Sequence, residues 1–363
     1  MISRGAVRSY AQTLSRDPLW LAIRNHWHPL YRTGLVASLS AVLAWIHINM
    51  PGKYPDFTVF WVASVHASAA VYDSHFLTQL QHGPPGDRPF AYPPTFLAMI
   101  LPLAVLPFKA AYIVWVSFSV TAFVEAGMRL TRYAWLALFS PTLMFAAFIG
   151  QTTLLFGALA IIGLVIAKDH PQRAGIALGV AACIKPHLLL FVPVVLVMER
   201  NWRALCWTVG TGAALAVMAT LLFGIEIWPS WLNSLRSFIA INERLKIDRL
   251  GLAWPWSLFA VPLFLALIGH AIRDKDVARI ILAALGGGML LSPHAVFYEV
   301  TILLVPAVAM IGLTWRSLPV LYLLAGGAAS SASLLVSVVL LSIPLSRREF
   351  RDRGAVSGDR AEG

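Results

Sequence analysis

The chain has 363 residues, of which 58% are hydrophobic and 12% are charged. Soluble domains average about 25% charged residues, so this composition excludes an ordinary soluble protein and indicates an integral membrane protein. The net charge of +11 does not indicate nucleic-acid binding, because the basic residues lie mainly in short segments between long apolar runs, as the positive-inside rule predicts.

The apolar runs predict an all-α polytopic membrane protein, since they are continuous and lack the alternation of barrel strands. A full crossing needs about 20 residues, and several runs are shorter. We therefore expect 9–12 transmembrane or half-membrane helices. The runs cover residues 34–50, 95–107, 109–128, 133–149, 152–167, 174–184, 187–198, 204–224, 254–272, 279–292, 297–314 and 318–343.

Three parts of the chain differ in character. Residues 1–33 are basic and show no clear cleavable signal peptide, so we expect the first apolar run to be an uncleaved signal anchor with a cytoplasmic N-terminus. Residues 34–343 form the membrane domain. Residues 344–363 are charged and are expected to be disordered.

Basic clusters predict the orientation of the membrane domain. The segments KDHPQR (168–173), ERNWR (199–203) and RDKDVAR (273–279) are expected on the cytoplasmic side. Counting spans from them places the loops 51–92 and 225–253 on the extracytoplasmic side. Tryptophans of the second loop are candidates for anchors that lie flat on the outer surface.

The stretch KYPDFTVFW (53–61) follows the first span and holds Asp56. One interpretation is a helix N-cap, because an Asp before an apolar run is typical of a helix start. The other is a general base, because a carboxylate in a partly dry site can take a proton from a hydroxyl.

Two polar positions interrupt apolar runs further along the chain. Gln151 could cap a helix or form a hydrogen bond with a sugar. Lys185, followed by His187, could bind a phosphate as a point charge, or could be a lysine that extends to the membrane surface. Both runs beside Lys185 are short, so a hairpin entering from the inside would bring it towards the outer leaflet.

A third polar group follows Pro293 and consists of His294, Tyr298 and Glu299. It suits contact with a phosphate or a hydroxyl, or it is an ordinary polar turn. Tyr92, before two prolines, stands at the entry to the second span. The orientation brings five polar residues to the same membrane face: Asp56, Gln151, Lys185, His294 and Glu299.

No nucleotide or metal signature is present. The sequence lacks a P-loop, a dinucleotide fingerprint, HExxH and a DxD pair. Cys183 and Cys206 lie within apolar runs, where neither a disulfide nor a metal site is expected. We therefore expect no cofactor and no metal. An enzyme acting outside the cell would draw on a sugar delivered on a lipid phosphate.

Six motifs occur in a fixed order: YPDFTVFW, VYD, YPPTFLAMILPLAVLP, GQTTLL, RAGIALGVAACIKPHLLLFVP and LLSPHAVFYEVTILLVP. Together, over residues 34–315, they resemble glycosyltransferase family 87 of the GT-C superfamily. The resemblance implies a GT-C-type fold with short amphipathic helices in the first extracytoplasmic loop. It also implies a bacterial inner-membrane protein with its active site on the extracytoplasmic side.

The family includes mannosyltransferases that use polyprenol-phosphate mannose. The resemblance therefore implies transfer of a hexose, mannose above all, from a polyprenyl-phosphate sugar to a glycolipid or glycan acceptor, with inversion. It makes Asp56 the catalytic base. It makes the following residues candidates for substrate binding: Tyr92, Gln151, Lys185, His187, His294, Tyr298 and Glu299. Glu299 stands where many members have Asp.

Three alternatives remain at this point. A transporter or flippase of a lipid-linked or anionic substrate would also place polar residues in the membrane, although no repeat relates the two halves. A membrane scaffold would not need polar residues in six segments. An O-antigen-ligase-like enzyme would need key Arg and His residues in one late outer loop, and residues 225–253 hold Arg but no His.

Overall fold

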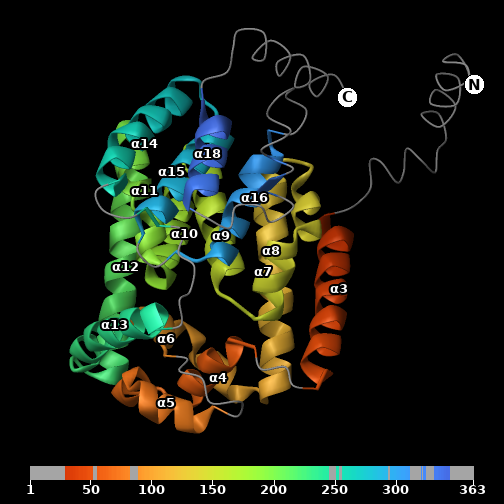
Figure 1. Ribbon diagram of the computed structural model, residues 1–363, viewed down its shortest axis with the longest axis vertical. Coiled ribbons are helices and arrows are strands. Elements are labelled where there is room, and N and C mark those ends of the chain that lie inside the picture. The colour runs from red at the N-terminus through yellow and green to blue at the C-terminus, as the bar shows by residue number, and fades with distance from the viewer. Residues whose placement is uncertain are drawn as a thin grey trace, which may run out of the picture.

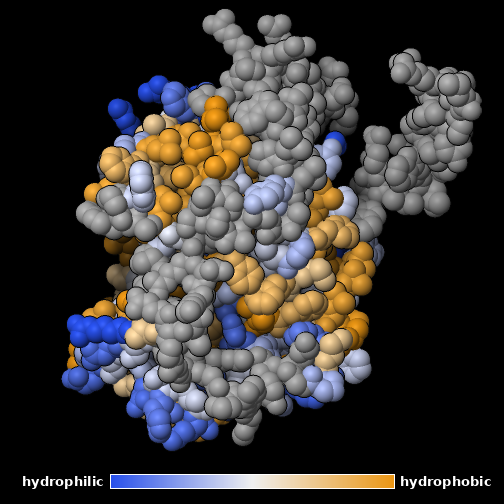
Figure 2. Space-filling model, viewed as in Figure 1, coloured by the Kyte–Doolittle hydropathy of each residue, from blue (hydrophilic) through white to orange (hydrophobic). Residues whose placement is uncertain are grey.

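The computed structural model describes residues 29–51, 55–81, 89–244, 251–252, 256–292, 295–310, 320, 322–323 and 331–343. All regular elements in these ranges are helices. Figure 2 shows hydrophilic residues gathered at the two ends of the molecule and apolar residues between them. This arrangement confirms the predicted all-α membrane protein.

Within the described residues, four helices are long and apolar enough to cross a membrane: α3 (Pro29–Asn49), α7 (Phe108–Leu130), α12 (Trp202–Phe223) and α14 (Trp256–Arg273). Two further helices pass the same test only when taken together, as a broken span or a re-entrant loop. These two helices, α8 (Pro141–Phe148) and α9 (Thr153–Val165), meet at 117°.

Most of the remaining apolar runs form shorter helices, as their lengths predict. Most of these helices gather at the end of the molecule that holds Met310, and α7 and α12 extend from this group to the opposite end (Figure 1). They are α10 (Pro171–Ile184), η4 (Pro186–Leu189), α11 (Val192–Met198), α15 (Val277–Leu291), η5 (Phe297–Val300), α16 (Thr301–Val308) and α18 (Ser331–Ser342). A 3-10 helix, η3 (Ala134–Phe139), precedes α8.

The predicted first outer loop folds into three short helices at the opposite end: α4 (Phe57–Val65), η1 (Ala69–Tyr72) and α5 (Ser74–Leu80). Helix α5 buries only Leu77, as expected of a surface helix. Helix α4 differs from the expectation because it is buried on nearly every side. It packs against α6 (Pro94–Ile100) and η2 (Leu101–Val105).

The second predicted outer loop contains α13 (Ile227–Arg244), which lies beside η1 and α6 (Figure 1). Two of its tryptophans donate hydrogen bonds that hold it in place. Trp231 Nε1 donates to the carbonyl of Ala91 at 3.2 Å, and Trp228 Nε1 donates to Thr220 Oγ1 at 2.8 Å.

A charged pair attaches α3 to α7. Arg32 Nε donates to Glu125 Oε1 at 3.0 Å, and Thr33 Oγ1 donates to the same oxygen at 3.0 Å. The pair compensates both charges within apolar helices, where an isolated charge is costly. The rest of α3 is mostly exposed, with Trp45 58% accessible, as expected of a helix that faces lipid.

Two glycines one turn apart let α10 approach α12 closely. A Cβ on Gly175 would lie 2.4 Å from Trp207 Cβ and 2.5 Å from the carbonyl oxygen of Ala204. A Cβ on Gly179 would lie 2.6 Å from Thr211 Cβ. This spacing of small residues is typical of membrane helices whose backbones touch.

We predict that Gly175→Ala lowers the apparent melting temperature in detergent, by the equivalent of about 1–3 kcal/mol, because the added methyl forces two backbones apart. Gly210→Ala on α12 is the matched control, since no atom lies within 4 Å of its added Cβ. The control should raise stability by roughly 0.5–1 kcal/mol through helix propensity. An unchanged melting temperature for Gly175→Ala would refute the close packing.

Candidate functional site

The candidate site is built on the turn between α8 and α9. Gly150 has a φ of +72°, in the left-handed region that favours glycine. A Cβ on this residue would also lie 2.6 Å from Phe57 Cβ. Glycine at this position therefore allows both the sharp bend and the close approach of α4.

The bend leaves backbone carbonyls without helical partners, which is costly in apolar surroundings. Three donors satisfy three successive carbonyls. The Tyr112 hydroxyl donates to Phe148 at 2.6 Å, the Phe57 N–H donates to Ile149 at 3.0 Å, and Trp115 Nε1 donates to Gly150 at 2.9 Å. Two of these donors come from α7, and the third is the first residue of α4.

The side chain that follows these carbonyls contacts Asp56. Gln151 Nε2 donates to Asp56 Oδ2 at 2.8 Å. Asp56 occupies the N-cap position of α4, but its side chain makes no capping hydrogen bond. The carboxylate is half-buried and is directed to Gln151, which is itself buried.

Tyr92 orients the Gln151 amide. Its hydroxyl donates to Gln151 Oε1 at 3.2 Å and shares a hydrogen bond with Thr152 Oγ1 at 3.0 Å. With Oε1 held by a hydroxyl, the amide nitrogen is the end that faces Asp56. Burial raises the pKa of the Tyr92 hydroxyl above its ordinary value, so this group stays protonated and can donate.

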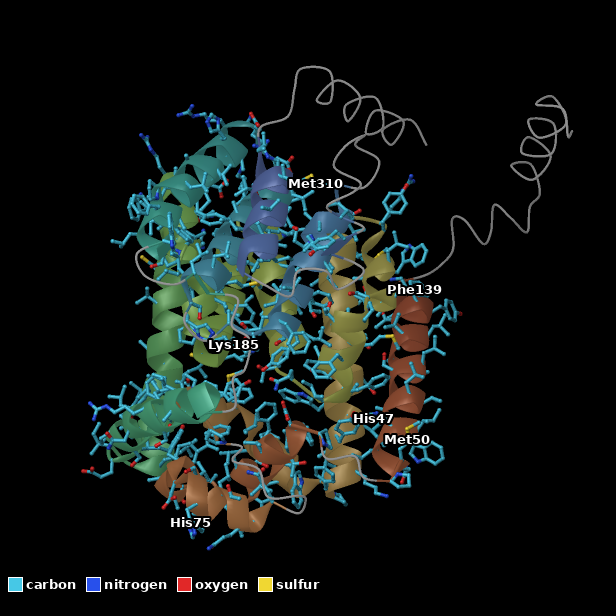
Figure 3. The ribbon with its side chains drawn as sticks, in the orientation of Figure 1. His47, Met50, His75, Phe139, Lys185 and Met310 are labelled. Carbon is cyan, nitrogen blue, oxygen red and sulfur yellow. The ribbon has the colours of Figure 1, made fainter. Side chains whose placement is uncertain are left out.

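Lys185 lies between α10 and η4, about midway between Met310 and His75 in Figure 3. Its Nζ donates to Glu299 Oε1 at 2.6 Å and to Thr153 Oγ1 at 3.1 Å. Both charged side chains are nearly inaccessible. The ring centroid of Tyr298 lies 5.7 Å from the same nitrogen, within range of a cation–π contact.

Glu299 compensates the charge of Lys185 but is not itself saturated. Its Oε2 is buried, and no hydrogen-bond partner for it is found among the described residues. A buried carboxylate oxygen without a partner costs about 1–3 kcal/mol or more. The site thus contains one acceptor that a ligand donor could satisfy.

Six of the predicted residues meet at this turn. The turn side chains at 151, 152 and 153 link Asp56 and Tyr92 on one side to the Lys185–Glu299 pair on the other, and Tyr298 lies beside that pair. His187 is half-buried on η4, and none of the hydrogen bonds described above reaches it. His294 lies outside the described residues.

Four residues of the site were not singled out from the sequence. Thr152 and Thr153 are fully buried, and the two adjacent hydroxyls of GQTTLL between apolar runs were an available signal. Tyr112 and Trp115 lie inside an apolar run with other aromatic residues, and nothing in the pattern separates them from core residues.

The described part of the chain offers no group of three or more His, Cys, Asp or Glu residues placed to hold a metal ion. Cys183 and Cys206 are both free thiols. The polar groups available for chemistry at the turn are therefore carboxylates, an amide, hydroxyls and one ammonium group.

Comparison with known proteins gives one match. The family model for glycosyltransferase family 87 matches residues 90–344, which include all the candidate residues except Asp56. No curated protein and no solved structure matches the chain. Since the family model covers more than half of the sequence and the fold is a polytopic bundle of apolar helices, the chain belongs to glycosyltransferase family 87 and is a membrane glycosyltransferase.

Proposed function

We propose that the chain transfers a hexose, with mannose the first candidate, from a polyprenyl-phosphate sugar to a hydroxyl of a glycolipid or glycan acceptor. The reaction takes place on the extracytoplasmic face of a bacterial inner membrane and inverts the anomeric configuration. One observation carries the proposal: the Asp56 carboxylate does not cap its helix but is held by Gln151 at 2.8 Å, beside a buried Lys185–Glu299 pair.

Asp56 is the proposed general base. It takes the proton of the acceptor hydroxyl, whose oxygen then forms a bond to the anomeric carbon. The bond from that carbon to the phosphate oxygen breaks, and the polyprenyl phosphate leaves with the electron pair. Gln151 fixes the direction of the carboxylate, because Tyr92 holds the other end of its amide.

Lys185 is the proposed contact for the donor phosphate, with His187 and His294 as further candidates. A donor phosphate would share the Lys185 ammonium group with Glu299. Glu299 would therefore weaken the attraction between Lys185 and the phosphate. The sugar of the donor brings hydroxyls that could donate to the unpartnered Glu299 Oε2. Cationic side chains can stabilise a monophosphate leaving group, so the proposal requires no metal.

A transporter or flippase remains the alternative, and no observation on this site favours it. The family match supports a transferase. In proteoliposomes supplied with a panel of polyprenyl-phosphate sugars and of glycolipid or glycan acceptors, a transferase releases polyprenyl phosphate and forms a glycoside on the acceptor. A transporter would instead move the intact lipid between leaflets.

We predict that Asp56→Asn lowers the rate of transfer by about 10²–10⁴-fold, because asparagine cannot accept the proton. Asp73→Asn is the matched control on the same outer segment. Asp73 is exposed and caps α5 by accepting from the N–H groups of His75 and Phe76, which asparagine can also do. Full activity of a folded Asp56→Asn protein would remove Asp56 from the catalytic role.

We predict that Glu299→Gln lowers the melting temperature, since breaking a buried ion pair leaves Lys185 uncompensated at a cost of about 3–5 kcal/mol. Polyprenyl phosphate should then raise the melting temperature more in this variant than in the wild type, because the phosphate restores the missing negative charge.

The control for this substitution is Glu226→Gln, at an exposed position before α13. It should leave both the melting temperature and the response to polyprenyl phosphate unchanged. If Glu299→Gln and the wild type respond equally to polyprenyl phosphate, Lys185 does not bind the donor phosphate.

A further inference from the structure

We propose that Tyr112 and Trp115 of α7 are positioning residues that hold Gln151 against the Asp56 carboxylate. Neither side chain touches Asp56 through a described hydrogen bond. Both act on the backbone of the turn that carries Gln151. The inference rests on the proposed function, because it assigns their effect to the base of that reaction.

The two residues are three positions apart, so they lie on the same face of α7. Both are buried, and each donates one hydrogen bond to the turn, at 2.6 Å and 2.9 Å. They bind the carbonyls of Phe148 and Gly150, which flank the carbonyl bound by the backbone of α4. The His47 ring of α3 stacks on Phe148 at 4.8 Å and on Tyr112 at 6.3 Å between centroids.

These contacts form a closed series of residues that includes the proposed base, Asp56. The Trp115 ring lies 5.9 Å from the ring of Phe57, the residue that follows Asp56. The Phe57 N–H binds Ile149, and Gln151, two residues later, returns to Asp56. A shift of the turn relative to α7 therefore strains both the Phe57–Ile149 bond and the Gln151–Asp56 bond.

The N–H groups of the turn bind back to carbonyls of α8, but the carbonyls of Phe148, Ile149 and Gly150 depend on donors from α7 and α4. Glycine at position 150 also permits other backbone angles. Loss of one donor would let the turn move until another group satisfies its carbonyl. A displacement of about 1 Å at a reacting group can lower a rate by about 10²-fold.

Amide hydrogen exchange tests the positioning without any substrate. Tyr112→Phe and Trp115→Phe should each accelerate exchange in the peptide that spans residues 149–153 by roughly five- to tenfold, as expected for loss of one hydrogen bond. Trp202→Phe on α12, where the tryptophan is 56% exposed, is the matched control and should leave this peptide unchanged. Unchanged exchange in both α7 variants overturns the proposal.

Kinetics then test whether the positioning serves the reaction. Each α7 variant should lower kcat by about tenfold and leave the KM for the donor nearly unchanged. In a Gln151→Met background, the same α7 substitutions should lower kcat by less than about twofold, because their effect passes through Gln151. Additive losses in that background would show a merely structural role and overturn the proposal.

The two proposals fail differently. If the wild-type protein releases no polyprenyl phosphate with any donor, the proposed function is wrong, and the exchange experiment still decides whether α7 holds the turn. If the wild type is active, Asp56→Asn is inactive and the α7 variants keep the wild-type kcat, the proposed function stands and the positioning role is wrong.

Discussion

The structure depends on one constraint: a helix broken inside an apolar bundle must have its exposed carbonyls satisfied by protein groups. The bend between α8 and α9 frees the carbonyls of Phe148, Ile149 and Gly150. The donors that satisfy them come from α7 and α4, so the solution to a backbone problem also fixes where the next three side chains lie. The hydrogen bonds that satisfy the broken helix are therefore the same bonds that set the geometry of the candidate site.

Charged side chains in several parts of the bundle are compensated by pairing. Arg32 and Glu125 join α3 to α7, Lys185 and Glu299 join the hairpin after α10 to η5, and the fully buried Arg279 pairs with Asp274 beside α15. Arg279 also donates to the carbonyl of Ser342 at the end of α18. Among these, the Lys185–Glu299 pair is the one attached to the broken helix, and it is the pair that a charged ligand could exchange.

Much of the fold could be predicted from the sequence, because long apolar runs determine helices by composition. The predicted run 204–224 became Trp202–Phe223, and 254–272 became Trp256–Arg273. The grouping of Asp56, Gln151, Lys185 and Glu299 came from counting half-length runs between basic clusters. The pairing of Lys185 with Glu299 could not be predicted, since 114 residues separate them. Nor could the roles of Tyr112 and Trp115, because a donor aimed at a carbonyl and an aromatic core residue have the same sequence pattern. The burial of α4 was missed because its position in a loop suggested a surface helix, although a helix without a polar face is typical of a buried element.

The separation of Lys185 and Glu299 has a consequence for the synthesis of the protein. The ribosome adds roughly 5–20 residues each second, so Lys185 precedes its counter-ion by roughly 6–23 seconds. During that interval the lysine is part of an apolar hairpin with no Glu299 to neutralise it. Because an uncompensated lysine is costly inside a bilayer, the α10 hairpin is less stable there until η5 arrives. The order in which the helices settle in the membrane then depends on a charge in the site as well as on hydrophobicity.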